Sequence, residues 1–266
     1  MNETEWIGRT ETREAHVDAT RVAELAACLD RDAPADFLPP GWHWAFFNPA
    51  AKASALGPDG HPARGGFLPP VALQRRMWAG GDLRFHAPIP IGAAATRRST
   101  IRNVVRKRGR TGDLVFVAVD HAIDVDGRLC LEETHDIVYR DIGPAAAAVA
   151  APTDEDWSQA MRADAVLLFR YSAVTFNGHR IHYDRAYATQ VEAYPGLIVH
   201  GPLLATLLQG FAERVGGAKL KRFAFRGAAP LFDGEEFALC GKADGNFWVR
   251  AADGRLIQQA QADFVA

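Results

Sequence analysis

The sequence predicts an α+β fold built from two halves of similar pattern. Each half places an apolar helical segment before a run of β-favouring strands, and glycine-containing turns separate the strands. A stretch rich in alanine and proline, residues 143–152, divides the sequence near its middle. The chain has 266 residues, 48% of them apolar, which is enough for two domains of about 100 to 150 residues each.

The first half is predicted to begin with a helix after Asp18, a residue type that caps helix N-termini well. Four apolar residues share one face of this helix: Val22, Leu25, Ala26 and Leu29. Residues 33–70 are rich in proline and glycine, and within them residues 41–55 are predicted to form a helix with an aromatic face in the core. The strand pattern then takes over, most clearly in residues 83–86, 96–105, 114–119 and 137–139.

The second half is predicted to begin with a strand over residues 165–171. The turn-forming pair Asn177-Gly178 follows it. Residues 185–191 are predicted to form a short helix, with Asp184 as its N-cap. A polar loop between two ordered elements is a good frame for catalytic residues.

A longer apolar helix is predicted for residues 201–212, where Pro202 suits the first turn. Strands follow it at residues 220–225, 236–240, 246–250 and 256–264. A helix followed by antiparallel strands in each half fits a double hot-dog fold, in which two curled antiparallel sheets each wrap a central helix. The predicted divisions are an N-terminal domain, a linker and a C-terminal domain, at residues 1–143, 144–156 and 157–266.

Composition argues against several classes of protein. The formal net charge is −2, and the densest positive region, residues 97–110, also fits a charged strand face, so no nucleic-acid partner is expected. The three cysteines are widely spaced, which favours a reducing compartment and no zinc site. No apolar run approaches the ~20 residues of a membrane span, and the acidic N-terminus lacks a signal-peptide core. We therefore expect a cytoplasmic protein without a membrane partner.

The chemically richest stretch is residues 171–184, which contain two histidines, an asparagine and an aspartate. The stretch resembles the signature of the R-specific enoyl-CoA hydratases of the MaoC family. That signature runs aromatic, small spacer, aliphatic, Ser/Thr, Gly, then Asp-x-Asn-Pro-aliphatic-His-x-Asp. Six residues fit it: Tyr171, Val174, Thr175, Ile181, His182 and Asp184. Four residues depart from it: Phe176 replaces the glycine, Asn177 the aspartate, and His179 and Arg180 the Asn-Pro step.

One branch of that superfamily is more similar to the string at residues 176–184. This branch contains the two-domain mesaconyl-C4-CoA (3-methylfumaryl-CoA) and itaconyl-CoA hydratases and the related mitochondrial hydroxyacyl-thioester dehydratases. Unusual strings at residues 66–70 and 75–81 extend the resemblance over nearly the whole chain. The resemblance implies hydration of a short branched dicarboxylyl-CoA, with CoA as part of the substrate and no held cofactor. It also implies a homodimer or a larger homo-oligomer.

Hydration of an enoyl thioester needs a base for the water, donors for the enolate-like oxygen and an acid for the α-carbon. His182 is the predicted base, because an unperturbed imidazole titrates near pH ~6.5. Asn177 is predicted to hold the water by hydrogen bonding, since an amide cannot act as a base. The alternatives are a buried structural histidine at position 182 and an ordinary Asn177-Gly178 turn.

The resemblance implies that the N–H of Gly201 polarises the thioester carbonyl. Unpaired amides at a helix N-terminus suit a developing oxyanion, and glycine allows close approach. The alternative is that Gly201 only gives a tight entry into the helix.

Five further residues are predicted to bind substrate: Arg75, Arg76, Arg180, His179 and His200. A guanidinium binds a carboxylate or a CoA phosphate bidentately, although Arg75 and Arg76 also suit structural ion pairs. No spacing predicts a metal, flavin or nicotinamide site. Three other functions remain open: a 3-hydroxyacyl-ACP/CoA dehydratase of fatty-acid synthesis, a non-catalytic acyl-CoA-binding protein, and a hot-dog thioesterase.

Overall fold

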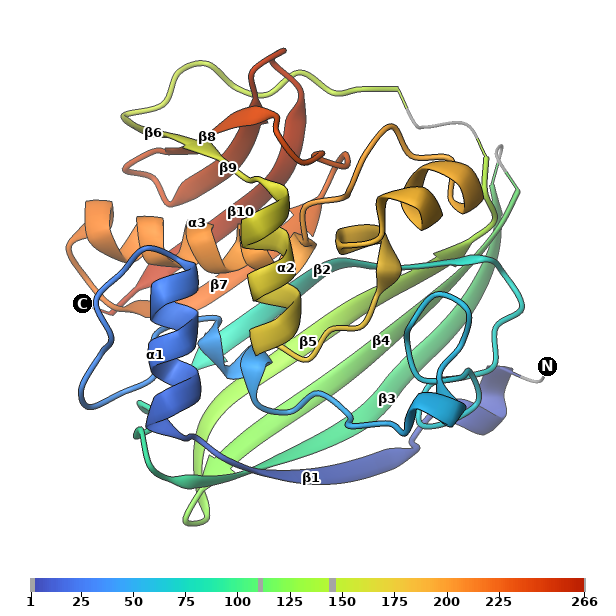
Figure 1. Cartoon of the computed structure of the whole chain (residues 1–266). Coiled ribbons are helices and arrows are strands. Elements are labelled where there is room, and N and C mark those ends of the chain that lie inside the picture. Colours follow the sequence, from blue (N-terminus) through green and yellow to red (C-terminus); the bar gives the residue numbers. More distant parts are fainter. Residues whose placement is uncertain (1–2, 110–111, 144–146, 266) are drawn as a thin grey trace.

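The computed structural model describes residues 3–109, 112–143 and 147–265, and in these ranges ten strands form one antiparallel sheet (Figure 1). The strand order is β1-β3-β4-β5-β2-β7-β10-β9-β8-β6. The strands of the first half are β1 Thr10–His16, β2 Arg75–Phe85, β3 Ala94–Gly109, β4 Gly112–Val125 and β5 Arg128–Arg140. Those of the second half are β6 Trp157–Arg162, β7 Leu220–Gly227, β8 Glu236–Gly241, β9 Asn246–Ala251 and β10 Leu256–Phe264.

The sheets of the two halves are joined edge to edge, because β2 pairs with β7. Gly80 lies opposite Arg226 and Arg84 opposite Arg222 in this register. The Arg222 guanidinium also binds Asp82 across the junction, with 2.6 Å between Nη2 and Oδ2. The two predicted sheets are therefore one continuous surface, and the α+β class is confirmed.

Three α-helices lie on one face of this sheet (Figure 1): α1 Ala19–Cys28, α2 Ala165–Val174 and α3 Gly201–Gly216. Helix α3 is buried along most of its length and packs on β2 and on β7 to β10, as expected for an apolar central helix. Short helical turns complete the structure: η1 Glu3–Trp6, η2 Trp42–Ala45, η3 Ala53–Ala55, η4 Arg180–His182 and the π-helix η5 Tyr187–Val191. None of the helices in the described ranges is long and apolar enough to cross a membrane.

Most predicted elements are confirmed. Asp18 caps α1, since its Oδ1 accepts a hydrogen bond of 2.8 Å from Arg21 N. Helix α3 begins at Gly201 as predicted and ends before Gly217, whose φ of 67° is the left-handed cap that glycine adopts easily. Strands β7 to β10 match their predicted ranges within a few residues. Strand β1 was not predicted, because its alternating pattern consists largely of charged residues on an edge of the sheet.

Two predicted elements are wrong. Residues 165–171 form helix α2 instead of a strand: the Asp164 side chain caps the helix by accepting from Leu167 N at 2.9 Å. Val166 and Phe169 lie on the exposed face of α2. The continuous apolar run of residues 166–169 therefore has the sequence pattern of a buried strand, although it is helical. Residues 41–55 form two short turns, η2 and η3, because Pro49 interrupts any longer helix.

The predicted linker falls partly outside the described chain. Residues 144–146 are not among the described residues. Residues 147–156 contain no helix or strand apart from an isolated bridge between Ala150 and Arg255. The division into domains at residues 143 and 157 stays a prediction, although the junction of β2 with β7 makes the sheet continuous across it.

Candidate active site

His182 lies in η4, at the end of the polar loop that follows α2. Its Nδ1 donates a hydrogen bond of 2.8 Å to the carbonyl of Ile198. This bond fixes the proton on Nδ1 and leaves Nε2 as an acceptor. Burial lowers the pKa of His182 to about 4, against the smaller opposing effect of the Ile198 hydrogen bond. The side chain is therefore a neutral imidazole at pH 7, which is the form that a general base requires.

His200 holds the ring of His182 from one side. The two rings are stacked, with centroids 3.6 Å apart and planes 18° from parallel. His200 Nε2 and Ser172 Oγ form a hydrogen bond of 2.8 Å, so α2 fixes His200 in turn. Burial also keeps the pKa of His200 well below its ordinary value. The structure thus brings the predicted residues His182 and His200 together, and assigns His200 the position of a support for His182.

Gly201 follows His200 and is the first residue of α3. Its amide belongs to the first turn, where N–H groups have no acceptor within the helix and carry partial positive charge. A Cβ added at Gly201 would lie 3.7 Å from the carbonyl oxygen of Trp78, an ordinary contact distance. The fold itself would therefore accept alanine here.

A loop of the first half, residues 57–62, packs against the loop that carries His179 and His182, and sequence analysis missed this contact. Arg180 N donates to the carbonyl of Asp59 at 2.9 Å. Gly60, with a φ of 84°, lies so close to Gly178 that an added Cβ would be 2.0 Å from its carbonyl oxygen. The signal was present in the Gly-Pro-Asp-Gly-His-Pro string of residues 57–62, which is more than a flexible connection. The place of residues 57–62 in the site becomes visible only from the contact between the two loops.

The docked loop brings a histidine and aspartate pair beside His179. Asp59 Oδ2 accepts from His61 Nδ1 at 3.2 Å, and the His61 ring lies 4.2 Å from that of His179. The rings of His179 and His182 are 5.4 Å apart and perpendicular. Burial lowers the pKa of both His61 and His179, so that three neutral imidazoles line the site. Burial alone would raise the pKa of Asp59, but its bonds to His61 outweigh this and the pKa is lowered.

Asn177 occupies a tight turn. Its Oδ1 accepts a hydrogen bond of 3.0 Å from His179 N, and its own N–H donates to Ser172 O at 2.8 Å. This geometry is that of an Asx-turn, which was the structural alternative. The side-chain amide nitrogen is still available as a donor, so the predicted contact of Asn177 with water stays a prediction.

Two of the three predicted arginines are engaged inside the protein. Arg180 binds Asp184, with 2.7 Å between Nη2 and Oδ2, and lies 4.2 Å from the centre of the Tyr187 ring. Arg75 binds Glu192, with 3.1 Å between Nε and Oε2, and also donates to the Glu192 carbonyl. For these two residues the structure has the ion pairs that were the alternative to substrate binding.

Arg76 differs from both of them. It lies opposite Tyr139 in the β2–β5 register. Burial is the main cause of the lowered pKa of His61 and His179, and the nearby positive charge of Arg76 adds to the lowering of the pKa of both and of Asp59, so Arg76 lies near the histidine cluster. Among the described residues no ion pair joins Arg76 to a carboxylate. Arg76 is therefore the predicted arginine that is best placed to meet an anionic group of a substrate.

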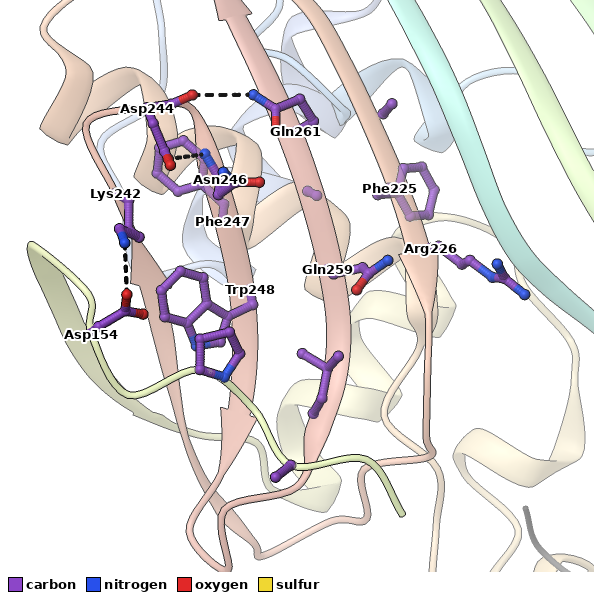
Figure 2. A pocket seen from close by; sticks show the side chains of 15 residues that line it. Asp154, Phe225, Arg226, Lys242, Asp244, Asn246, Phe247, Trp248, Gln259 and Gln261 are labelled. Atoms are coloured by element: carbon purple, nitrogen blue, oxygen red, sulfur yellow. Dashed lines mark hydrogen bonds and ion pairs between the residues drawn. The ribbon is translucent and has the colours of Figure 1, made fainter. Parts of the chain in front are cut away.

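A hollow lies elsewhere on the molecule. Its volume is about 690 Å³, and it lies over β7, β9, β10 and the segment before β6 (Figure 2). Trp248, Gln259 and Gln261 are among the side chains that line it. None of the predicted site residues does, so the hollow is separate from the histidine cluster.

Comparison with known proteins adds a family match. Residues 41–233 match the family model described as hydroxyacyl-thioester dehydratase type 2. The chain is 47% identical over 252 residues to a mesaconyl-C(4)-CoA hydratase of Chloroflexus aurantiacus, covering 91% of this chain and 89% of that protein. It is 28% identical over 251 residues to the mitochondrial hydroxyacyl-thioester dehydratase type 2 of Schizosaccharomyces pombe, covering 84% of each.

Solved structures share the fold. HtdX of Mycobacterium tuberculosis superposes with a TM-score of 0.71 at 20% identity, covering 97% of this chain and all of that one. A conserved Mycobacterium tuberculosis protein with a double hot-dog fold superposes with a TM-score of 0.61 at 13% identity, covering 96% of this chain and 95% of that one. These likenesses confirm the predicted double hot-dog.

Proposed function

The chain belongs to the hydroxyacyl-thioester dehydratase type 2 family, and from this premise we propose that it is a hydro-lyase that adds water reversibly across the double bond of an enoyl-CoA. One observation carries the proposal: a neutral buried imidazole, His182, is stacked on the residue that precedes the free amide of Gly201. A base beside an oxyanion donor is the combination that hydration of a thioester requires.

In the proposed reaction a water molecule lies between His182 and His61. Nε2 of His182 takes one proton of the water, and the oxygen forms a bond to the β-carbon. Nε2 of His61 accepts a hydrogen bond from the O–H that stays with the water oxygen, because Asp59 holds the other nitrogen of that ring. The amide nitrogen of Asn177 donates to the water oxygen. This arrangement supplies the orientation that the family's usual aspartate provides, without a carboxylate at position 177.

The electrons of the double bond move toward the thioester oxygen as the new bond forms. The N–H of Gly201, at the positive end of α3, donates to this oxygen. The imidazolium of His182 then returns its proton to the α-carbon, and the neutral base is restored. A desolvated imidazolium releases its proton readily, as the lowered pKa of His182 indicates. The hydration itself needs no cofactor or metal in this scheme.

The proposed substrate is a short, branched dicarboxylyl-CoA such as mesaconyl-C4-CoA or itaconyl-CoA. The relative named mesaconyl-C(4)-CoA hydratase, 47% identical, supports the first. Arg76 is proposed to bind the distal carboxylate of the acyl group, since Arg75 and Arg180 already have carboxylate partners. The unesterified carboxylate would then distinguish this substrate from a neutral enoyl-CoA of similar length.

A direct assay tests the hydro-lyase proposal. The purified chain is incubated with mesaconyl-C4-CoA, and loss of the enoyl-thioester absorbance is followed while mass spectrometry detects the product. A product heavier by one water supports the proposal. An unchanged thioester, recovered after long incubation with excess protein that nevertheless binds it, would favour the non-catalytic acyl-CoA-binding alternative. Release of free CoA would indicate a thioesterase.

Dehydration of 3-hydroxyacyl thioesters on an acyl carrier protein is a second candidate. The 28% identity to a mitochondrial dehydratase of the same family favours it. Presenting one 3-hydroxyacyl group on CoA and on acyl carrier protein distinguishes the two, because only the carrier-specific enzyme should prefer the protein-bound form by kcat/KM.

A cytoplasmic location and a homodimeric or larger assembly complete the proposal. Three buried cysteines without disulfide partners suit a reducing compartment. Sedimentation of the purified protein gives the assembly state, and a monomer would remove that part of the proposal.

A further inference from the structure

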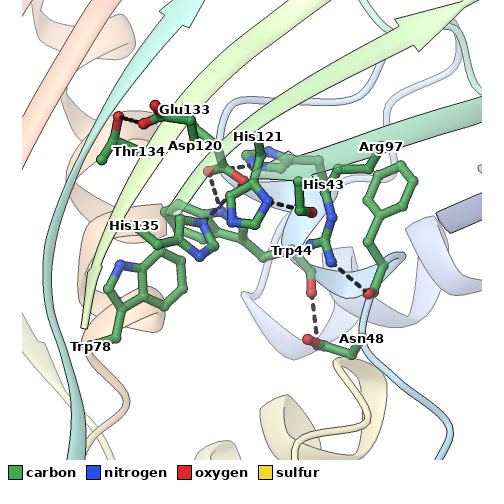
Figure 3. Close-up of polar contacts among 12 residues, drawn as sticks. His43, Trp44, Asn48, Trp78, Arg97, Asp120, His121, Glu133, Thr134 and His135 are labelled. Carbon is green, nitrogen blue, oxygen red and sulfur yellow. Dashed lines mark hydrogen bonds and ion pairs between the residues drawn. The ribbon is translucent and has the colours of Figure 1, made fainter. Parts of the chain in front are cut away.

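We propose that the sheet of the first half carries a binding site for a divalent transition ion of the zinc type, formed by His121 of β4 and by Glu133 and His135 of β5. One nitrogen or oxygen atom of each residue lies within 4.8 Å of the other two. His121 is directly opposite Glu133 in the β4–β5 register, and His135 follows two residues later on the same face (Figure 3). Two imidazoles and one carboxylate are a ligand set that zinc accepts, with a fourth position left for water.

The three atoms that face one another are also the ones without hydrogen-bond partners. His121 Nε2, Glu133 Oε1 and His135 Nε2 are each buried, and none has a hydrogen bond in the described part of the chain. His135 Nε2 is 3.0 Å from Glu133 Oε1, but the two are not aligned for a hydrogen bond. Buried polar atoms without partners are uncommon and call for an explanation. One cation between them would satisfy all three.

The second polar atoms of His121 and Glu133 are already fixed by neighbours. His121 Nδ1 is hydrogen-bonded to Ser99 Oγ at 2.7 Å. Glu133 Oε2 accepts from His43 Nε2 at 3.1 Å and from Trp44 Nε1 at 2.9 Å. Such outer contacts orient metal ligands in known sites, because they set the tautomer of a histidine and the rotamer of a carboxylate.

Packing of the neighbouring rings favours the same conclusion. The Trp78 ring lies against His135, with centroids 4.0 Å apart, and His121 lies on the other side of His135 (Figure 3).

One neighbouring charge opposes the ion. The Arg97 side chain is mostly buried, which lowers its pKa, and the nearby Glu133 carboxylate opposes that lowering. Arg97 also donates to the carbonyl of Phe47 and lies 4.0 Å from the Glu11 carboxylate. These contacts offset part of its positive charge. We therefore expect weaker binding than at a closed site with four protein ligands.

A second group of residues, Asp59, His61 and His179, also has ligand atoms within 4.8 Å of one another. There, however, both oxygens of Asp59 already accept hydrogen bonds from His61. This group serves as the matched comparison for the test.

The experiment measures metal directly. The full chain is freed of metal with a chelator and dialysed, and zinc per chain is measured after addition of zinc chloride. We expect one zinc ion per chain in the wild type and in His61→Gln, and a loss of at least tenfold in affinity in His121→Gln and in His135→Gln. At a hundredfold excess over the dissociation constant, zinc should raise the unfolding midpoint of the wild type by roughly 5–10 °C.

A second measurement covers variants that fail to fold. Crystals of the wild-type chain soaked in zinc should show an anomalous scattering peak between His121, Glu133 and His135. No bound zinc, a peak only at His61 and His179, or unchanged binding in folded His121→Gln would each overturn the proposal. In those cases the cluster is a buried imidazolium–carboxylate pair. Hydration of enoyl-CoA by the chelator-treated chain is expected to persist, so the two proposals fail separately.

Discussion

At the scale of single residues, the site depends on histidines that burial keeps neutral. Four of them lie in sequence-distant segments, at positions 61, 179, 182 and 200, and successive rings are in contact. Burial disfavours the charged form of an imidazole, so each of these rings stays uncharged. The chemistry of the site therefore follows from exclusion of water as much as from the identity of the residues.

A graded set of substitutions tests the roles of these histidines. His182→Ala should lower kcat by about 10²–10⁴-fold, the usual loss on removing a general base. His61→Ala should lower it by a smaller factor, about tenfold, because its proposed role is to orient the water. His86→Ala, at an exposed position paired with Glu132, is the control and should leave kcat unchanged. A folded His182→Ala variant with near wild-type kcat would remove this residue from the mechanism.

The pH dependence of stability follows from the same burial. The pKa of His182 is about 4 in the folded protein and near 6.5 in the unfolded chain, so the unfolded chain binds the extra proton first. Stability is thus retained above about pH 6.5 and is lost as the pH falls toward 4. His182 alone should contribute a loss of about 2 kcal/mol between about pH 7.5 and pH 5. Urea unfolding of the wild type and of His182→Gln at both values measures this, and equal losses in the two proteins would contradict it.

The two roles of Asn177, in the turn and in the proposed contact with water, can be tested separately. Asn177→Asp keeps the acceptor for His179 N but loses the amide donor to the water; it should stay active because a carboxylate, the family's usual group at this position, can hold the water by accepting from it. Asn177→Ala should lose about 1 kcal/mol of stability with the turn, and about tenfold in kcat if its amide also holds the water. Both quantities are measured on the same preparations. A normal kcat in a folded Asn177→Ala would reduce this residue to a turn.

At the scale of elements, the helices and strands that the sequence predicts best are those whose burial pattern is regular. Helix α3 and strands β7 to β10 bury their apolar residues consistently, and each was predicted within a few residues. Helix α2 was mistaken for a strand, because Val166 and Phe169 are apolar yet exposed. No local pattern reveals that a helix leaves such residues on the surface.

The residues of the candidate site also fall into a group that the sequence predicts and a group that it does not. His182, His200 and Gly201 were predicted from one motif and one helix start, and the structure brings them together. Asp59 and His61 were missed, because their role depends on contact with a loop about 120 residues later in the chain. The partner of Arg75 was equally hidden, since Glu192 lies far along the chain. The Arg180–Asp184 pair, in contrast, has the i,i+4 spacing that sequence can reveal.

The start of α3 gives a prediction at this scale. Gly201→Ala keeps the backbone amide and meets no close contact, so the unfolding midpoint should change little. The added methyl group occupies the space beside the amide, and kcat/KM should fall roughly 10–10²-fold, less than the loss of a whole oxyanion donor. Gly210→Ala, in the same helix, faces only the flexible Arg31 side chain and is the matched control. If both variants have wild-type kcat/KM, Gly201 is only the entry to the helix.

At the scale of the whole molecule, the site is shared between the halves. His182 and Gly201 come from the second half, whereas Arg76, Asp59 and His61 come from the first. The docked loop and strand β2 therefore carry the residues that face the catalytic loop from the other side.

Substrate preference tests this sharing. Arg76 is half-buried, and substrate bound over it would bury its guanidinium, which is costly without a carboxylate partner. The enzyme should therefore prefer dicarboxylyl-CoA over crotonyl-CoA by roughly 10²–10⁴ in kcat/KM. Arg76→Met should shrink that preference by weakening the dicarboxylyl substrate more than crotonyl-CoA. Arg75→Met, at the adjacent residue that binds Glu192, should leave the preference unchanged even where it lowers stability. Equal turnover of both substrates by the wild type would exclude carboxylate recognition and leave the hydro-lyase activity in place.

The pairing of β2 with β7 has a consequence for any attempt to divide the protein. A chain cut between residues 143 and 157 would separate the base from Arg76 and His61, and would expose one unpaired strand edge on each fragment. Each fragment alone would be inert and inclined to aggregate, and turnover would return only as the two fragments reassociate. The turnover rate of such a divided protein would therefore report how much of it has β2 paired with β7.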